Sequence, residues 1–185
     1  TAEVLDFTIL ASRIKVGAQL TYFDANQMAE ENEDIQLLYR LASQFRQRRL
    51  EAGALQISLP EIHVWVDRAG QVQVNQVNRE SPGRMLVTEM MIMANWLTAR
   101  YLKENRHPAI FRSQTAPRER LFKGDEGSLF QNWMQRKLLN RFVLGTGAEP
   151  HAGLGLDAYV TATSPIRKYY DLATQRQVRA LLGLE

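Results

Sequence analysis

The sequence predicts an α+β fold in which a mixed or antiparallel sheet packs with several helices, one of them buried in the core. Apolar residues recur with helical spacing in some segments and alternate with polar residues in others, and the two kinds of segment follow each other irregularly. No internal repeat or low-complexity linker divides the 185 residues. We therefore expect one folded unit.

The first part of the chain is expected to be extended and then helical. Residues 3–16 alternate weakly and are predicted to be extended, and residues 20–28 are predicted to open a short helix. A longer helix is predicted over residues 34–53, with Asp34 as its cap. The apolar face of this helix consists of Ile35, Leu38, Ala42 and Phe45.

A β-hairpin and a buried helix are predicted next. Apolar residues alternate on both sides of a turn at Ala69–Gly70 within residues 61–77, which predicts the hairpin. Residues 81–105 begin with Ser-Pro, a signature of helix starts, and are apolar on nearly all sides. Such a helix is typical of a protein core.

The last part of the chain is predicted to alternate between strands and helices. Residues 108–114 and 157–164 have the composition of strands, and residues 128–142 have that of an amphipathic helix. The second strand is expected to lead directly into a final helix that begins after Ser164.

The composition excludes several kinds of functional site. The chain has no cysteine, which excludes disulfides, cysteine-ligated zinc, iron–sulfur clusters and a thiol nucleophile. Its three histidines are scattered, so any metal would be held by carboxylates, as magnesium is. The sequence contains no apolar run long enough to span a bilayer and no signal-peptide pattern, so we expect a cytoplasmic protein without a membrane partner.

Basic residues gather in four short stretches of the sequence. The net charge is only +3, but residues 46–49, 106–120, 136–137 and 167–168 combine cations with nearby aromatic residues. This mixture fits phosphate contacts and base stacking in a nucleic-acid-binding protein. For any one stretch taken alone, a solvated surface is the favoured explanation.

The segment TSPIRKYYD, residues 163–171, has an unusual charge for the start of a helix. Ser164 and Pro165 are typical of the first helical positions, which places Arg167 and Lys168 in the first turn. A helix N-terminus already carries about half a positive charge. Two cations at this position therefore indicate an anion in front of them.

Two groups of acidic residues need an explanation. Glu89 lies in the most apolar helix, where an ionised carboxylate requires a partner, as in a buried ion pair or a functional site. Its candidate partners are Arg84, Arg112 and Arg167. The acidic run at residues 29–34 is expected to be a solvated loop rather than a magnesium site, because nothing aims its consecutive carboxylates inward.

Two blocks of sequence resemble the ribonuclease II (RNB) family of exoribonucleases. Residues 149–177 are similar to a family signature in which a glycine-containing loop leads to Tyr, then to Thr-Ser-Pro-Ile-Arg-Arg/Lys-Tyr, and then to Asp. Residues 85–95, MLVTEMMIMAN, resemble the family helix Glu-Glu-x-Met-x-x-Ala-Asn, and they lie upstream of the signature, as they do in the family.

The resemblance implies that residues 1–185 are the C-terminal part of an RNB catalytic domain. The family hydrolyses single-stranded RNA from its 3′ end and releases nucleoside 5′-monophosphates, with magnesium bound by aspartates. The resemblance thus implies single-stranded RNA as partner and Mg²⁺ as cofactor of the intact enzyme, with ligands outside this chain. The anion in front of Arg167 would be the phosphate of the terminal nucleotide.

Arg167 is the expected catalytic residue, because its planar guanidinium can bind two phosphate oxygens while charge develops on them. Lys168 offers a point charge, Thr163 and Ser164 offer hydroxyl and N–H donors, and the nearby tyrosines can pack beneath the site or stack on bases. The expected RNA-binding residues are Tyr159, Thr163, Ser164, Lys168, Tyr169, Arg84, Thr88 and Glu89. No metal ligand is expected in this chain.

The sequence departs from the family pattern at several points. The aspartate-rich metal motif, DxxDxDD, does not occur, so a missing N-terminal part of the same catalytic domain is an expected partner. Thr88 stands where the family commonly has a glutamate that helps to recognise the ribose hydroxyl. Ile57 stands near the position of an aromatic residue that helps to clamp stacked bases.

Three functions from different classes agree with these observations. The chain is part of an exoribonuclease, or an RNA-binding module without hydrolysis, or a structural or assembly domain with an RNB-like fold. An aspartate-rich motif upstream would favour the first function, and a lack of RNA binding at low salt would favour the third.

Overall fold

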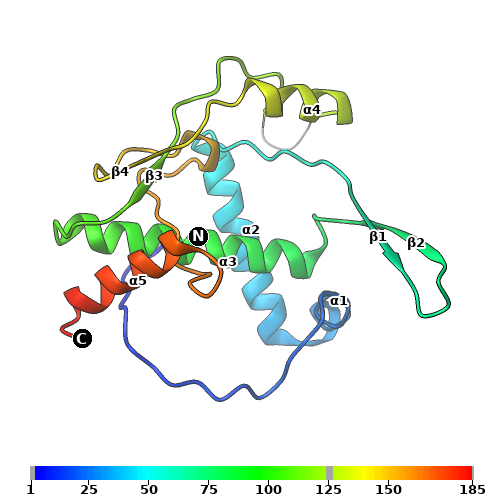
Figure 1. Ribbon diagram of the computed structural model, residues 1–185, viewed down its shortest axis with the longest axis horizontal. Helices are drawn as coiled ribbons and strands as arrows, with labels where there is room; N and C mark the ends of the chain where they lie inside the picture. The colour runs from blue at the N-terminus through cyan, green and yellow to red at the C-terminus, as the bar shows by residue number, and fades with distance from the viewer. Residues whose placement is uncertain (1–2, 124–126, 185) are drawn as a thin grey trace.

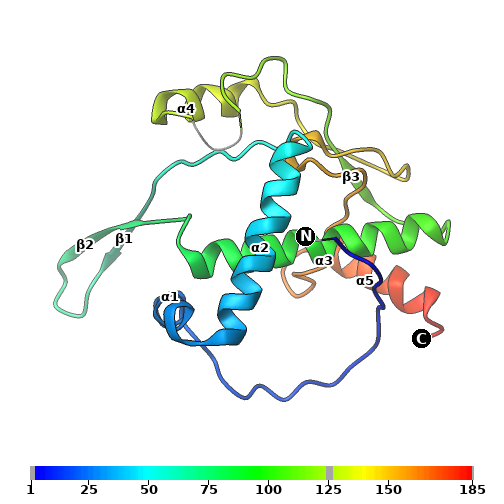
Figure 2. The same cartoon turned by 180° about the vertical axis from the view of Figure 1, so that it is seen from behind.

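The computed structural model describes residues 3–123 and 127–184, and its central element is a long helix (Figure 1). This helix, α3 (Pro82–Glu104), is crossed by α2 (Glu33–Glu51), and α1 (Tyr22–Glu31) contacts both. The view from behind shows the same crossing of α2 over α3 (Figure 2). Within the described ranges, no helix combines the length and hydropathy that a bilayer span requires.

The first two helices are separated by one residue that caps both of them. Asn32 ends α1, and its side-chain oxygen accepts a hydrogen bond of 3.0 Å from the Ile35 backbone N–H at the start of α2. The prediction that Asp34 is the cap was therefore wrong. Asp34 lies in the first turn instead, where a negative charge is favoured by the helix dipole. The weakly alternating residues 3–16 form neither helix nor strand.

The predicted hairpin is confirmed. Strand β1 (Glu61–Val66) pairs antiparallel with β2 (Val72–Val77). In the turn between them, the Asp67 carboxylate accepts hydrogen bonds from two backbone N–H groups, and Gly70 adopts a φ of 79° that favours glycine. The hairpin extends away from the helices in both views, and most of its apolar side chains are exposed on both faces (Figures 1 and 2).

A second, shorter strand pair lies in the C-terminal half. Strand β3 (Phe111–Ser113) pairs antiparallel with β4 (Val143–Gly145), and α4 (Leu129–Leu138) lies between them in sequence. The α+β class is confirmed, but the strands form two separate two-stranded sheets rather than one. Helix α4 is shorter than predicted because the backbone becomes extended at Leu139.

The predicted strand over residues 157–164 does not form. The Tyr159 carbonyl accepts a hydrogen bond of 2.8 Å from the Arg112 N–H, and the Ala162 N–H donates to the Asn95 side chain at 2.9 Å. The backbone of this segment is thus bonded to the middle residue of β3 at one point and to a helix side chain at another. A buried apolar segment can therefore have the sequence pattern of a strand although its backbone does not pair in a β-sheet.

The last helix, α5 (Tyr169–Leu181), begins four residues later than predicted. The Ser164 backbone N–H donates a 2.9 Å hydrogen bond to the buried Asp171 carboxylate, which lies in the first turn of α5. This contact folds residues 165–167 into a turn, so Arg167 precedes the helix and Lys168 is its N-cap residue. The prediction that both cations lie in the first helical turn was therefore wrong.

The core consists of two clusters along α3. One cluster joins the C-terminal half of α3 to β3, the buried segment and α5; it contains Ala99, Leu102, Ala109, Phe111, Ala158, Val160 and Val178. The other contains Phe45 of α2 together with Leu156 and Tyr159, and Ile92, Met93 and Trp96 of α3 pack against it. The prediction of a buried helix is correct for one side of α3 only, because Val87 and Met91 on the other side are exposed.

A tight backbone contact fixes the loop that precedes the buried segment. Gly155 has a φ of 64°, and a Cβ atom at this position would lie 2.3 Å from the Arg49 carbonyl oxygen. The loop therefore requires glycine in order to reach the end of α2. This glycine-rich stretch is an ordered structural contact, and it includes a short 3₁₀ helix at Ala152–Leu154.

Candidate functional site

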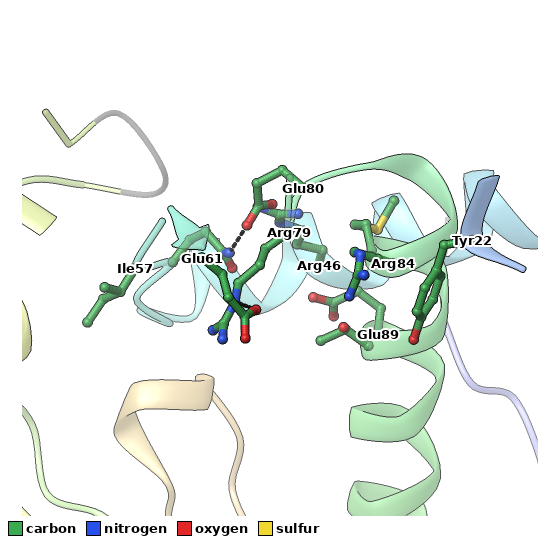
Figure 3. A pocket seen from close by; sticks show the side chains of 11 residues that line it. Tyr22, Arg46, Ile57, Glu61, Arg79, Glu80, Arg84 and Glu89 are labelled. Atoms are coloured by element: carbon green, nitrogen blue, oxygen red, sulfur yellow. Dashed lines mark hydrogen bonds and ion pairs between the residues drawn. The ribbon is translucent and has the colours of Figure 1, made fainter. Parts of the chain in front are cut away.

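Three of the predicted RNA-binding residues line one cavity of about 350 Å³ between the start of α3 and the base of the hairpin (Figure 3). They are Arg84, Thr88 and Glu89, and Ile57 lines the same cavity. The other charged residues of the lining are Arg46, Arg79, Glu61 and Glu80. The cavity therefore contains three cations and three carboxylates.

Two arginines of the cavity are paired with acids. The Arg46 guanidinium lies 2.7 Å from the Glu80 carboxylate, and the Arg79 Nε lies 2.7 Å from the Glu61 carboxylate. The hydrogen bond from Arg79 lowers the pKa of Glu61 below its usual value. These four charges are partly exposed and compensate one another, so they leave little net charge for a ligand.

Glu89 forms a buried ion pair with Arg49 of α2. The two hydrogen bonds measure 3.0 Å and 2.5 Å, and the residues are 2% and 5% exposed. A third hydrogen bond of 3.0 Å runs from Arg49 to the Leu154 carbonyl. The three partners that the sequence suggested for Glu89 were therefore wrong. Arg49 follows Ala42 and Phe45 at positions i+7 and i+4, which places it on the buried face of α2.

Arg84 is the cation of the cavity that remains open to a ligand. Its guanidinium lies 4.3 Å from the ring centroid of Tyr22, and it forms no ion pair with any residue that the structure describes. Thr88 lies one helical turn further along α3 with its side chain exposed. The guanidinium and the hydroxyl thus offer donors for a phosphate or a sugar on one face of the helix. Sequence reasoning missed Tyr22.

Tyr159 is buried and cannot stack on a base. Its hydroxyl accepts a hydrogen bond of 3.0 Å from Asn95, and its ring contacts His151 edge-on at 5.6 Å between centroids. Burial raises the pKa of the Tyr159 hydroxyl above its usual value. The ring is therefore packed in the interior and is not available for stacking on a base.

The residues around Tyr159 contain buried polar atoms without partners. Arg112 places its guanidinium 3.9 Å from the ring centroid of Phe142, and its Nε has no hydrogen-bond partner among the described residues. Burial lowers the pKa of His151 to about 4, and the charge of Arg112 acts in the same direction. His151 is therefore neutral at pH 7.

The turn that carries Arg167 is exposed to solvent, and its backbone is hydrogen-bonded to α5. Thr163, Arg167, Lys168 and Tyr169 are all exposed. The Arg167 guanidinium makes one long hydrogen bond of 3.4 Å to the Ser164 hydroxyl, and none of the described carboxylates forms an ion pair with it. The buried Asp171 holds the turn in place from α5. An anion can therefore reach Arg167 from solvent.

The predicted site residues occupy two places rather than one. None of residues 163–169 lines the cavity that contains Arg84 and Thr88. The turn is attached to α3 at Asn95, six residues after Glu89, which corresponds to about 9 Å along the helix axis. Helix α3 thus connects the cavity and the Arg167 turn without bringing their side chains together.

The residues described here do not fit a metal site. In the ranges 3–123 and 127–184, no three His, Asp or Glu side chains are grouped so that they could hold a metal ion. The acidic run at residues 29–34 is not the predicted loop; apart from Asn32, its residues belong to the end of α1 and the start of α2.

Comparison with known proteins identifies the family. The pattern that defines the RNB domain matches residues 1–183. The chain belongs to the RNB domain family. This RNB chain is 36% identical, over 187 residues, to an uncharacterized ribonuclease of Synechocystis, and the match covers 97% of the chain and 28% of that protein. The chain therefore spans little more than a quarter of the length of this relative.

Solved structures have the same fold as the RNB chain. An active-site mutant of the Dss1 exoribonuclease from Candida glabrata matches with a TM-score of 0.73 and 21% identity, over 91% of this chain and 24% of that one. Mycoplasma genitalium RNase R, in complex with ribose-methylated single-stranded RNA, matches with a TM-score of 0.67 and 17% identity, over 87% and 32%. Yeast Ssd1, a pseudonuclease, matches with a TM-score of 0.61 and 15% identity, over 89% and 25%.

Proposed function

We propose that this RNB chain is part of a hydrolytic 3′→5′ exoribonuclease that degrades single-stranded RNA to nucleoside 5′-monophosphates. The observation that carries the proposal is the Arg167 turn, a solvent-facing guanidinium held on a fixed backbone in a family that includes ribonucleases. Phosphodiester hydrolysis needs such a group, because negative charge grows on the phosphate in the transition state.

Each residue of the turn has a role in this proposal. Arg167 binds two oxygens of the scissile phosphate and stabilises the developing charge. Lys168 and the Thr163 hydroxyl contact the neighbouring backbone of the RNA, and the exposed Tyr169 ring stacks on a base. Ser164 contributes its hydroxyl only, because its N–H is bonded to Asp171.

The cavity on α3 is proposed to bind an adjacent nucleotide. Arg84 contacts a phosphate and the exposed Thr88 hydroxyl contacts a ribose. Glu89 is a positioning residue rather than a ligand contact, because both of its oxygens are bonded to Arg49. A neutral hydroxyl at position 88 binds a ribose hydroxyl less strongly than a carboxylate would. We therefore expect weaker discrimination of RNA from DNA at this position than in relatives that have glutamate there.

Magnesium is proposed to be bound outside this chain, by the N-terminal part of the same catalytic domain. The described residues do not fit a metal site, so the roles given above concern phosphate and sugar contacts only. We expect the 185-residue chain, incubated alone with Mg²⁺ and labelled single-stranded RNA, to release no mononucleotides.

A chimera tests the catalytic role of Arg167. In it, this chain replaces the matching segment of the Synechocystis relative, and single-turnover cleavage and RNA affinity are measured on the same protein. Arg167→Ala should lower the rate by about 10²–10³-fold and change affinity much less. Arg167→Lys should recover little, because one ammonium cannot bind two oxygens in a fixed geometry.

Arg179→Ala is the matched control, because Arg179 is an exposed cation in the last turn of α5. It should leave the cleavage rate unchanged. A structural role for Arg167 predicts a different result, in which Arg167→Ala lowers the melting temperature while the folded fraction keeps nearly normal turnover. That result would contradict the catalytic proposal.

A second candidate is an RNA-binding module without hydrolysis. The fold similarity to a pseudonuclease favours it, because it shows that the same architecture occurs without nuclease activity. Binding of single-stranded RNA by the chain, combined with a chimera that has no turnover, would support this candidate. A third candidate, a structural or assembly domain, would be supported if the chain binds no RNA even at low salt.

A further inference from the structure

Helix α4 is amphipathic in the opposite sense to an ordinary surface helix. Its buried side chains are two amides, Asn132 and Gln135, which are 1% and 0% exposed. Three of its five large apolar side chains are exposed, since Leu129, Phe130 and Trp133 are 62%, 69% and 46% exposed, while Met134 and Leu138 are partly buried. A helix that only packs on a core buries its apolar side instead.

The two amides fix this orientation. The Asn132 side-chain oxygen accepts a 2.8 Å hydrogen bond from the Ser58 N–H, and its nitrogen donates to the Gly127 carbonyl at 2.7 Å. The Gln135 oxygen accepts from the Leu121 N–H at 2.8 Å, and its nitrogen donates to the Glu119 carbonyl at 2.9 Å. Turning the helix to bury its rings would leave these buried polar groups unpaired, so the outward apolar face is enforced.

The exposed face combines aromatic rings with a cation. Phe130, Trp133 and Lys137 occupy positions i, i+3 and i+7 and therefore lie on one side of the helix. The two ring centroids are 6.3 Å apart, and the Lys137 ammonium lies 3.7 Å from the centroid of Trp133. This arrangement offers a flat ring and an adjacent positive charge to the same ligand.

The charges around α4 select among possible partners. Residues 118–142 contain six cations and three acids, and α4 itself contains Arg136 and Lys137 but no acid. Neither of these two cations forms an ion pair with another described residue. A purely apolar partner would leave both charges without compensation, whereas a polyanion with stacking bases satisfies the rings and the charges together.

We propose that the outward face of α4, formed by Phe130, Trp133, Arg136 and Lys137, is a stacking platform for single-stranded nucleic acid. None of these residues lines the α3 cavity or belongs to the Arg167 turn, so the platform is a separate binding surface. The choice of RNA as the natural ligand rests on the proposed function. The platform would bind a part of the strand away from its reacting end.

Fluorescence anisotropy with a fluorescein-labelled oligouridylate of twelve nucleotides tests the platform on the 185-residue chain at low salt. Trp133→Ala should weaken binding by about 5- to 150-fold, the range for loss of one stacked base. Trp133→Phe should retain most of the affinity. Circular dichroism and thermal melts should change little, because Trp133 is 46% exposed and belongs to neither core cluster.

Trp65→Ala is the matched control. Trp65 is 49% exposed on β1, and its ring has no cation over it among the residues the structure describes. The control should change affinity by less than about twofold, since a ring without neighbouring charge attracts little backbone phosphate. Equal losses for Trp65→Ala and Trp133→Ala would overturn the proposal.

The salt dependence gives a second readout. Lys137→Ala should reduce the slope of log affinity against log salt by about 0.7, the value for one phosphate contact on a single strand. Lys137→Arg should keep the slope. An unchanged slope in Lys137→Ala would overturn the part of the proposal that assigns a phosphate contact to α4.

The outcomes separate this inference from the proposed function. If Arg167→Ala lowers the cleavage rate of the chimera and Trp133→Ala leaves oligonucleotide binding unchanged, the platform is wrong and the catalytic proposal stands. If Trp133→Ala weakens binding while the chimera lacks turnover, the platform stands and the catalytic proposal fails. If the chain binds no oligonucleotide but self-associates through Trp133, α4 is a protein interface and the inference is overturned.

Discussion

The two strand pairs of the molecule show that the number of paired residues and the burial of their side chains are independent. The β1–β2 hairpin pairs six residues with six, yet most of its apolar side chains are exposed. The β3–β4 pair joins three residues with three, yet Phe111 within it is buried against α3 and α5. A two-stranded hairpin is marginally stable in water by itself. Burial against helices, rather than the length of the ladder, therefore determines which pair contributes to the stability of the fold.

The ion pairs show the same contrast. Arg49–Glu89, in the core, and Arg79–Glu61, at the base of the hairpin, have similar donor–acceptor distances. The first pair is almost fully buried and the second is partly exposed. Water and salt screen the second pair, while loss of one partner in the first would leave an uncompensated charge in the interior.

Of the substitutions that test this comparison, Arg49→Ala should lower the unfolding free energy most. It leaves Glu89 buried without a partner and the Leu154 carbonyl without a donor, and it should cost about 3–5 kcal/mol of unfolding free energy in urea titrations. Arg79→Ala is the control at the exposed pair and should cost less than about 1 kcal/mol. Equal costs for the two variants would show that burial does not separate the pairs.

Truncating a core residue should have the next largest effect. Leu102→Ala opens a cavity at a fully buried position of α3 and should cost about 2–5 kcal/mol in the same titrations. Val74→Ala removes an exposed side chain of β2 and should change stability by about 0.5 kcal/mol or less. A large cost for Val74→Ala would mean that the hairpin packs on the body in solution.

His151 makes the packed half of the molecule sensitive to acid. Its folded pKa of about 4 lies below the unfolded value of about 6.5, so the unfolded chain takes up a proton first as the pH falls. Its contribution to stability is fully present above pH 6.5 and is lost as the pH falls towards 4. Between pH 7 and pH 5, the unfolding free energy of the wild type should therefore fall by roughly 2 kcal/mol more than that of His151→Phe. If the unfolding free energy of the two proteins depends on pH in the same way, the lowered pKa of His151 is contradicted.

The smallest effect is expected on the hairpin itself. Val64 and Val74 face each other across the two strands and are both exposed. Replacing them together by Lys and Glu should change the unfolding free energy by less than about 1 kcal/mol, because the new pair is solvated. Light scattering at high protein concentration should decrease, since an exposed apolar hairpin promotes association. Strong destabilisation instead would argue for a packed hairpin.

The features that the sequence predicted well are those with local causes. The long helix at Glu33–Glu51 and the hairpin around Gly70 follow from periodicity and turn residues within a few positions. The need of Glu89 for a partner also followed from its apolar surroundings. The identity of that partner did not, because Arg49 lies 40 positions away and only the crossing of α2 and α3 brings the two together.

The prediction failures have a common physical origin. The pattern at residues 157–164 correctly indicated burial, but the hydrogen-bond partners of a buried segment depend on its spatial neighbours. The amphipathic pattern at residues 128–142 does not say which face is inside. That choice depends on backbone groups near Ser58, Glu119 and Leu121 that bind the two amides of α4. The start of α5 depends in the same way on Asp171.

The contact between the end of α2 and the 152–156 loop has a consequence for the order of folding. Arg49 bonds to Leu154 across 105 positions of the chain, and Gly155 fits against the Arg49 backbone. Loop closure over such a separation costs entropy before any contact compensates for it. The three N-terminal helices, whose contacts are closer in sequence, should therefore assemble first. Arrival of the 152–156 loop then completes the burial of Arg49, which makes this contact a late step in the formation of the native state.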